Sequence, residues 1–237
     1  MKEITHKGLS RLVGLYGSYS IDSDNLQILE SSSVEPDEKN REELYKGIFE
    51  AIMTSIRWLV NHTTKAKELS IQYINKASEA YNSGDHSWSR WLGWSFHFIT
   101  DWATPYHSLK SMSRYISDSK SDKSNKGAAN DDGFFLNSLK GVPDLLKFKV
   151  DHDKFEVICE ERWQQDEPII KDNFIKFKHN RMSFVDLEIF NEMMDELQVK
   201  CENLLLDWII NCTDQEFAQY MTDIAIIMDV ACCIVLG

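Results

Sequence analysis

Two pairs of histidine and carboxylate residues in this chain have a spacing that suits metal binding. His97 and Asp101 are four residues apart, and so are His152 and Glu156. Positions i and i+4 lie on the same face of a helix, so each pair can bind one ion. His107 follows six residues after Asp101 and adds a further imidazole. Imidazole and carboxylate ligands without thiolate suit zinc, manganese or iron, so the spacing predicts a metal site.

A simpler interpretation applies to each pair taken alone. A single histidine and aspartate pair on a helix is common and usually forms a surface hydrogen bond. Here the first pair lies in an aromatic-rich stretch from Trp88 to Trp102, where an unpaired buried charge would be costly. The seven tryptophans are most simply core residues. Two such pairs together with His107 favour the metal site over surface hydrogen bonds.

Helices are expected to hold these residues in place. Hydrophobic residues recur at helical spacing along the chain, and the alternation of half-buried strands is not visible. Helices are predicted at residues 5–18, 38–60, 65–82, 86–102, 151–166 and 183–210, with a last one after Thr213. Thr5 and Ser183 are predicted N-caps of two of these helices. Pro105 and Pro168 are expected to end or kink theirs.

The composition favours one all-α domain. Of 237 residues, 43% are hydrophobic, and only 10 are glycine and 4 are proline. These are few turn-forming residues for a β protein with many turns. We therefore predict a single multi-helix bundle over residues 1–237. Two polar stretches interrupt it: residues 31–37 are predicted to form a loop, and residues 117–133 a mobile surface insertion.

Charge and cysteine content narrow the function classes. The net charge of -12 repels nucleic acid and anionic membranes, so nucleic acid is not a favoured partner and an anionic substrate needs bound cations. Five cysteines without paired CxxC spacing argue against a cysteine zinc site or a disulfide framework. The apolar stretch 224–236 is too short for a transmembrane segment and contains Asp229. The first twenty residues show no signal peptide, so we expect a cytoplasmic protein, or a secreted one if a signal peptide was removed.

The residues around the two pairs resemble a known family. The segment LGWSFHFITDWATPYH, residues 92–107, is similar to the signature L-G-x-x-x-H-x-x-x-D-x-x-x-P-x-H of the bacterial zinc-dependent phospholipases C. The segment HDKFE, residues 152–156, is similar to the H-x-x-x-E segment of that family. The fungal single-strand-specific nucleases share its fold and metal architecture. The resemblance covers about residues 5–165 and implies a helical bundle of this type with a multi-zinc cluster.

The resemblance also implies further ligands and their grouping. His6 near the amino terminus, Asp37 in the loop after the first helix and His62 before the third match positions that bind zinc in the family. The family pattern assigns Asp37, His62, His97 and Asp101 to one ion, His107, His152 and Glu156 to a second, and His6 with a bridging Asp101 to a third. Secreted members hold the third ion with an amino-terminal tryptophan, which this chain lacks, so about two to three zinc ions are expected. Asp37 is the expected general base.

The activity implied is metal-assisted hydrolysis of a phosphate ester, namely a phospholipid, a nucleotide or another small phosphoester. Two alternatives remain open. A pocket lined by Trp94, Trp102 and other aromatic residues could hold an apolar diphosphate, which would make the protein a metal-dependent lyase or cyclase. Altered histidines would favour magnesium for that chemistry, and here the histidines are retained. The zinc could instead be structural in a non-catalytic interaction protein. A helical domain with a large apolar core, however, does not need several bound ions to stabilise its fold.

Overall fold

The computed structural model describes residues 2–37, 62, 64–108, 142–178 and 185–237. Within these ranges the regular secondary structure is helical and contains no strand, which confirms the predicted all-α class. The elements are α1 (Glu3–Tyr16), α2 (Ser23–Ser32), α5 (Ala66–Ser83), α6 (Trp88–Ala103), the 3-10 turn η2 (Pro105–His107), α9 (Val142–Lys178), α10 (Leu187–Cys201), α11 (Leu206–Asn211) and α12 (Asp214–Leu236).

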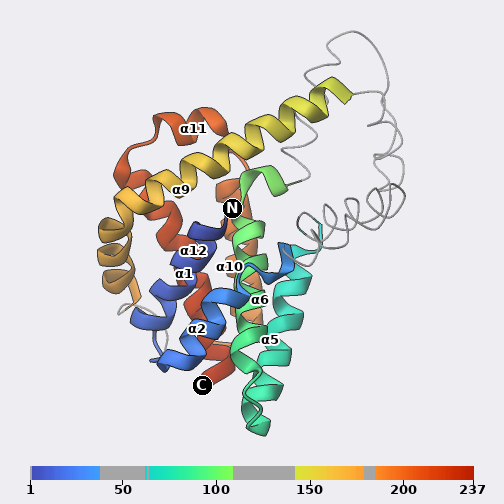
Figure 1. Ribbon diagram of the computed structural model, residues 1–237, viewed down its shortest axis with the longest axis vertical. Coiled ribbons are helices and arrows are strands. Elements are labelled where there is room, and N and C mark those ends of the chain that lie inside the picture. The colour runs from blue at the N-terminus through green and yellow to red at the C-terminus, as the bar shows by residue number, and fades with distance from the viewer. Residues whose placement is uncertain (1, 38–61, 63, 109–141, 179–184) are drawn as a thin grey trace.

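Helix α6 lies in the middle of the bundle. Figure 1 shows it between α2 and α5, and it also contacts α1, α10 and α12. Its surroundings cover every face, because six consecutive residues from Phe96 to Asp101 are all buried. Pro105 ends the helix region as predicted, and η2 follows directly. A buried central helix is therefore the element that carries His97 and Asp101.

Helix α12 forms the other main part of the core. Thr213 caps it as predicted, in a capping box with Glu216. The helix is longer than the apolar stretch 224–236 because it begins at Asp214. By length and composition alone, Asp214–Leu236 could cross a membrane, and 72% of its 18-residue apolar window is buried inside the fold. The core helix of a soluble bundle has this same character.

The amino-terminal elements differ from the prediction. Thr5 is not an N-cap: α1 starts earlier, at Glu3, and Thr5 is buried inside it. Helix α2 was not predicted, although the Asp22 side chain caps it by accepting hydrogen bonds from the backbone N–H groups of Asp24 and Asn25. The predicted loop at 31–37 is also wrong in part, because α2 continues to Ser32 and residues 35–37 are helical.

Pro168 neither ends nor limits its helix, because α9 continues through it to Lys178. A proline inside a helix removes one backbone hydrogen bond. Ile170 and Phe174, in the next two turns, are fully buried, so packing outweighs that loss. Figure 1 shows that the direction of α9 changes along its second half, as expected for a proline inside a helix.

The predicted helix 183–210 is two helices. Asp186 caps α10, accepting from the backbone N–H groups of Glu188 and Ile189, whereas the predicted cap Ser183 lies outside the described residues. The chain leaves helical geometry after Cys201 and re-enters it in α11. At this break the Tyr106 hydroxyl accepts a hydrogen bond from Leu206 N–H, which ties α11 to the segment after α6. The predicted helix 38–60 and the insertion 117–133 also lie outside the described residues.

Candidate metal centre

The structure brings together all eight residues that were predicted to bind metal. They come from separate segments: α1 supplies His6, α6 supplies His97 and Asp101, η2 supplies His107, α9 supplies His152 and Glu156, and the remaining two are Asp37 and His62. They form three groups whose potential ligand atoms lie within 4.8 Å of one another, namely His6/Asp37/His97, His62/His97/Asp101 and His107/His152/Glu156. Buried histidine and aspartate clusters of this kind could hold a metal ion.

Asp101 stands at the centre of the cluster with three imidazoles around its carboxylate. Its Oδ2 lies 3.1 Å from His97 Nε2 and also contacts His62 Nδ1. Its Oδ1 lies 3.3 Å from His107 Nδ1. The side chain is only 2% exposed, so these imidazoles replace the water that an aspartate normally requires. One carboxylate thus joins the His62/His97 group to His107 of the next group.

A backbone carbonyl orients His97 for ligation. His97 Nδ1 donates to the carbonyl oxygen of Ser33 at 2.9 Å, so only Nε2 can face an ion. Nε2 lies 3.3 Å from His62 Nδ1. Two ligand atoms on one tetrahedral zinc ion are roughly 3.3–3.6 Å apart, because each lies about 2.0–2.2 Å from the metal. The pair therefore has the separation of two ligands of the same ion.

The group at η2 and α9 has similar dimensions. His107 Nε2 is 3.0 Å from His152 Nε2, and His152 Nε2 is 3.4 Å from Glu156 Oε1. The two imidazole rings are stacked, with centroids 5.1 Å apart. His152 and Glu156 meet because they are one turn apart on α9, as the sequence predicted. This group uses ligand atoms distinct from those around His97, so the two can hold separate ions.

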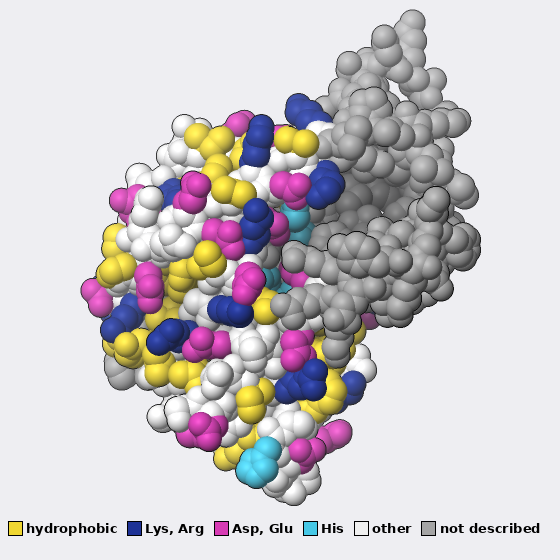
Figure 2. All heavy atoms as spheres, in the orientation of Figure 1, with side chains coloured by type: hydrophobic (Ala, Val, Ile, Leu, Met, Phe, Trp, Pro, Cys, Tyr) yellow, Lys and Arg dark blue, Asp and Glu magenta, His cyan; other side chains and the backbone are white. Residues whose placement is uncertain are grey.

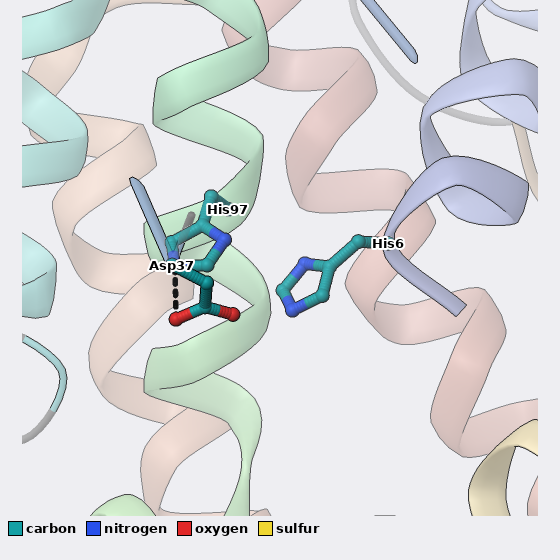
Figure 3. Close-up of side chains that lie close together, drawn as sticks. All are labelled: His6, Asp37 and His97. Carbon is teal, nitrogen blue, oxygen red and sulfur yellow. Dashed lines mark ion pairs between the residues drawn. The ribbon is translucent and has the colours of Figure 1, made fainter. Parts of the chain in front are cut away.

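His6 supplies an independent test of whether the site suits a metal. Its side chain is 1% exposed, and among the described residues neither ring nitrogen has a hydrogen-bond partner. The ring stacks on His97 with centroids 4.6 Å apart, and Figure 3 shows His6, Asp37 and His97 approaching one another from separate elements. A buried imidazole without a hydrogen bond is costly unless something binds it. The donor set therefore fits a metal ion.

Asp37 lies beside two of the groups. Its Oδ1 is 3.8 Å from His97 Nε2 and 3.7 Å from His62 Nε2. His97 belongs to both groups, but only its Nε2 is available and one nitrogen binds one ion. The two groups that contain His97 therefore form one site for a single ion. His6 lies at the edge of this site and is grouped with Asp37, whereas the family pattern pairs His6 with Asp101. Asp37 is 29% exposed, which makes it the carboxylate of this site that solvent can reach.

The protonation states follow from burial and charge. Burial acts to lower the pKa of His97, but Asp101 and Asp37 outweigh it and raise that pKa to about 9. Burial acts to raise the pKa of Asp101, but His97, His62 and His107 hold it well below its ordinary value. Burial lowers the pKa of His152 to about 4 and that of His6 well below its usual range. His6 and His152 are therefore neutral near pH 7, as metal ligands must be, whereas His97 in the metal-free protein is protonated and would release its proton when an ion binds.

The surroundings of the cluster carry mixed charge. Figure 2 shows acidic and basic side chains interspersed on this face, without a broad basic surface among the described residues. Two cavities, of about 460 and about 250 Å³, lie between α10 and α12 and share Leu197, Lys200 and Asp223 in their walls. Neither is lined by a predicted ligand. The predicted metal ligands therefore lie apart from these two cavities.

Sequence reasoning missed two groups that support the site, the Ser33 carbonyl and Glu35. The Ser33 carbonyl could not be identified because any residue type supplies it, and Glu35 gave no signal beyond its proximity to Asp37. Trp94 Nε1 donates to Glu35, whereas Trp102 Nε1 donates to the carbonyl of Met194 in α10, so the two indole N–H groups have different partners. They face different neighbours of α6.

Comparison of the chain with protein-family models, with curated proteins and with solved structures found no match. The functional argument therefore depends on the residues and geometry of this chain.

Proposed function

We propose that the protein is a zinc-dependent phosphoesterase with a bundle of the zinc-dependent phospholipase C and nuclease type. The observation that carries the proposal is the convergence of all eight predicted ligands, from segments as distant as α1 and α9, into adjacent groups whose ligand atoms lie within 4.8 Å of one another. The groups contain imidazole and carboxylate but no thiolate, a donor set that zinc accepts at catalytic sites. Their contact through Asp101 supports a multi-ion cluster over isolated structural ions.

A cluster of this kind suits an anionic substrate in an acidic protein. When bound, zinc ions neutralise a phosphate and acidify the water that attacks it. The residues of the chain have separable tasks. Asp101 and Ser33 orient the imidazoles, as their 3.1–3.3 Å and 2.9 Å contacts indicate. Asp37, the carboxylate open to solvent, is placed to accept a proton from water, which supports its proposed role as general base.

The substrate class is a small or lipid phosphate ester. Lyase or cyclase chemistry on an apolar diphosphate receives less support, because altered histidines and magnesium would suit it, whereas all five histidines of the family pattern lie in the ligand groups. A purely structural zinc site also receives less support, because the bundle has a large apolar core of its own. We propose a cytoplasmic location on the basis of the free cysteines, which are typical of a reducing compartment.

The test combines metal analysis with a screen of phosphate compounds. The purified protein is assayed for zinc and then for hydrolysis of p-nitrophenyl phosphate, bis(p-nitrophenyl) phosphate, phosphatidylcholine, a dinucleotide and an isoprenoid diphosphate. We expect release of alcohol or phosphomonoester from at least one ester, loss of this activity after chelation and recovery on addition of zinc. Bound zinc without any turnover would contradict the enzymatic proposal, and pyrophosphate release from the isoprenoid would favour the lyase.

A further inference from the structure

We propose that Glu35 is a positioning residue that holds Asp37 against α6 and thereby completes the metal site around His97. This inference rests on the proposed metal centre, but it concerns a residue that is not itself a ligand. Glu35 lies two residues before Asp37, in the short helical stretch 35–37. Because Asp37 enters the cluster from outside α6, something must fix its distance from the imidazoles.

Three N–H groups of α6 converge on one oxygen of Glu35. Its Oε2 accepts from Trp94 Nε1 at 2.9 Å and from Arg90 Nε at 2.9 Å, and it lies 2.8 Å from Arg90 Nη2. Charge-assisted hydrogen bonds from a guanidinium to a carboxylate are stronger than neutral ones, so they fix the position of this oxygen. Arg90 is 45% and Glu35 26% exposed, so water screens part of the ion pair, and the hydrogen bond from Trp94 adds a part-buried contact. The indole donor distinguishes this arrangement from a surface ion pair between two charged side chains alone.

The Trp94 donor is itself fixed by its neighbours. Its ring meets Tyr73 edge to face, with centroids 5.0 Å apart, and Trp91 in the same manner at 5.4 Å. The Arg90 guanidinium lies 5.8 Å from the centre of the Trp94 ring. The indole N–H therefore points in a direction set by packing and is already in place when Glu35 docks.

The chain from residue 33 to residue 37 contacts α6 at successive points. The Ser33 carbonyl accepts from His97 Nδ1, Glu35 meets Arg90 and Trp94, and Asp37 faces His97. The helix thus binds this segment on both sides of Glu35. A shift of Glu35 would move Asp37, whereas the His107/His152/Glu156 group has no part in this segment.

Gly93 gives independent evidence that the end of α2 packs closely against α6. A Cβ atom at this position would lie 2.8 Å from the Leu29 carbonyl oxygen and 2.8 Å from Ser32 Cβ. Real Cβ atoms essentially never approach other atoms so closely. The end of α2 therefore rests directly on the backbone of α6, just before the segment that carries Glu35. Glycine in the L-G-x-x-x-H motif has this physical role here.

The test measures stepwise zinc affinities by titration of the metal-free protein against a competing chelator. We expect Glu35→Ala to weaken one binding step by roughly 10–100-fold, the usual effect of losing a residue that supports a ligand, and to leave another step unchanged. Glu35→Gln, which keeps an acceptor oxygen, should recover part of the loss. Glu30→Gln is the matched control, because Glu30 is similarly exposed at 24% and faces Arg11 at 3.9 Å.

Cobalt-loaded protein gives a second readout. Its visible spectrum reports ligand geometry, so Glu35→Ala should alter the bands of one site while Glu30→Gln leaves them unchanged. Equal weakening of all zinc steps together with a lower melting temperature would show a merely structural role and overturn the inference. Unchanged affinities in Glu35→Ala would also overturn it, while leaving the phosphoesterase proposal intact. A wild-type protein that binds no zinc would instead overturn the metal centre itself.

Discussion

Replacing Asp101 by asparagine tests the centre of the cluster most directly. The carboxylate faces His62 and His97 through Oδ2 and His107 through Oδ1, so a single substitution affects the ligands of two groups. Asparagine has nearly the same shape but no charge, and its NH2 group would point a donor at imidazole nitrogens or at an ion. We expect the ion near His97 to be lost and the ion near His107 to be held more weakly.

The size of the effect follows from linkage between metal binding and folding. An ion present at 1,000 times its dissociation constant stabilises the folded state by about 4 kcal/mol. In a chain of this length, each 1 kcal/mol corresponds to a change in melting temperature of about 2–4 °C. Loss of one ion should therefore reduce the difference in melting temperature between zinc-loaded and metal-free protein by about 8–16 °C.

The assay is elemental analysis together with thermal unfolding of both forms of each variant. Comparing loaded with metal-free protein cancels the change that the substitution causes without metal. Asp229→Asn is the matched control. Asp229 lies on α12, and its buried carboxylate accepts hydrogen bonds from the backbone N–H and the hydroxyl group of Ser18, each at 2.6 Å. This substitution should lower the melting temperatures of both the zinc-loaded and the metal-free protein. It should leave the metal content and the difference between the two melting temperatures unchanged. Equal zinc content in wild type and Asp101→Asn would refute the reasoning.

Three further outcomes are expected from the same cluster. The pKa of His97 is raised to about 9, above its ordinary value of 6.5, so its stabilisation of metal-free protein is complete below about pH 6.5 and is lost as the pH rises toward 9. Unfolding in denaturant across this range should show that decline in wild type and not in His97→Gln. His152→Ala should remove the ion at α9 and leave the one near His97, as elemental analysis would show by partial and not complete loss of zinc. Gly93→Ala should destabilise the protein by about 1–3 kcal/mol through overpacking, measured by the denaturant midpoint; a neutral result would contradict the close contact with α2.

The ligand cluster was predictable where ligands are close in sequence and chemically distinctive. The i, i+4 spacing on α6 and α9 follows from helix geometry, so His97/Asp101 and His152/Glu156 could be paired without a structure. His6, Asp37 and His62 came from resemblance alone, because spacing says nothing about contacts between distant segments. The structure places them beside the pairs. Metal identity and reaction stay predictions, since geometry of this kind suits several ions.

The fold was predictable as a class but not in its connections. Strong amphipathic or apolar patterns located α5, α6 and α12, whereas the short helix α2 has few apolar residues and was missed even though Asp22 offered a capping signal. Pro168 was overrated as a helix breaker because burial of Ile170 and Phe174 was not known. Glu35 could not be recognised because its role depends on where Arg90 and Trp94 lie in space.

The order of the ligands along the chain has a consequence for biosynthesis. The group of His62, His97 and Asp101 is complete once α6 has been translated, whereas α12, which packs against α1, α5, α6 and α9, is the last of the described helices. A nascent chain thus presents the candidate ion-binding group before its apolar centre can close. Because bound metal contributes to folding free energy, early capture of an ion would hold α6 to the amino-terminal segments while the ribosome completes α12. We therefore expect zinc supply during translation to affect the yield of folded protein.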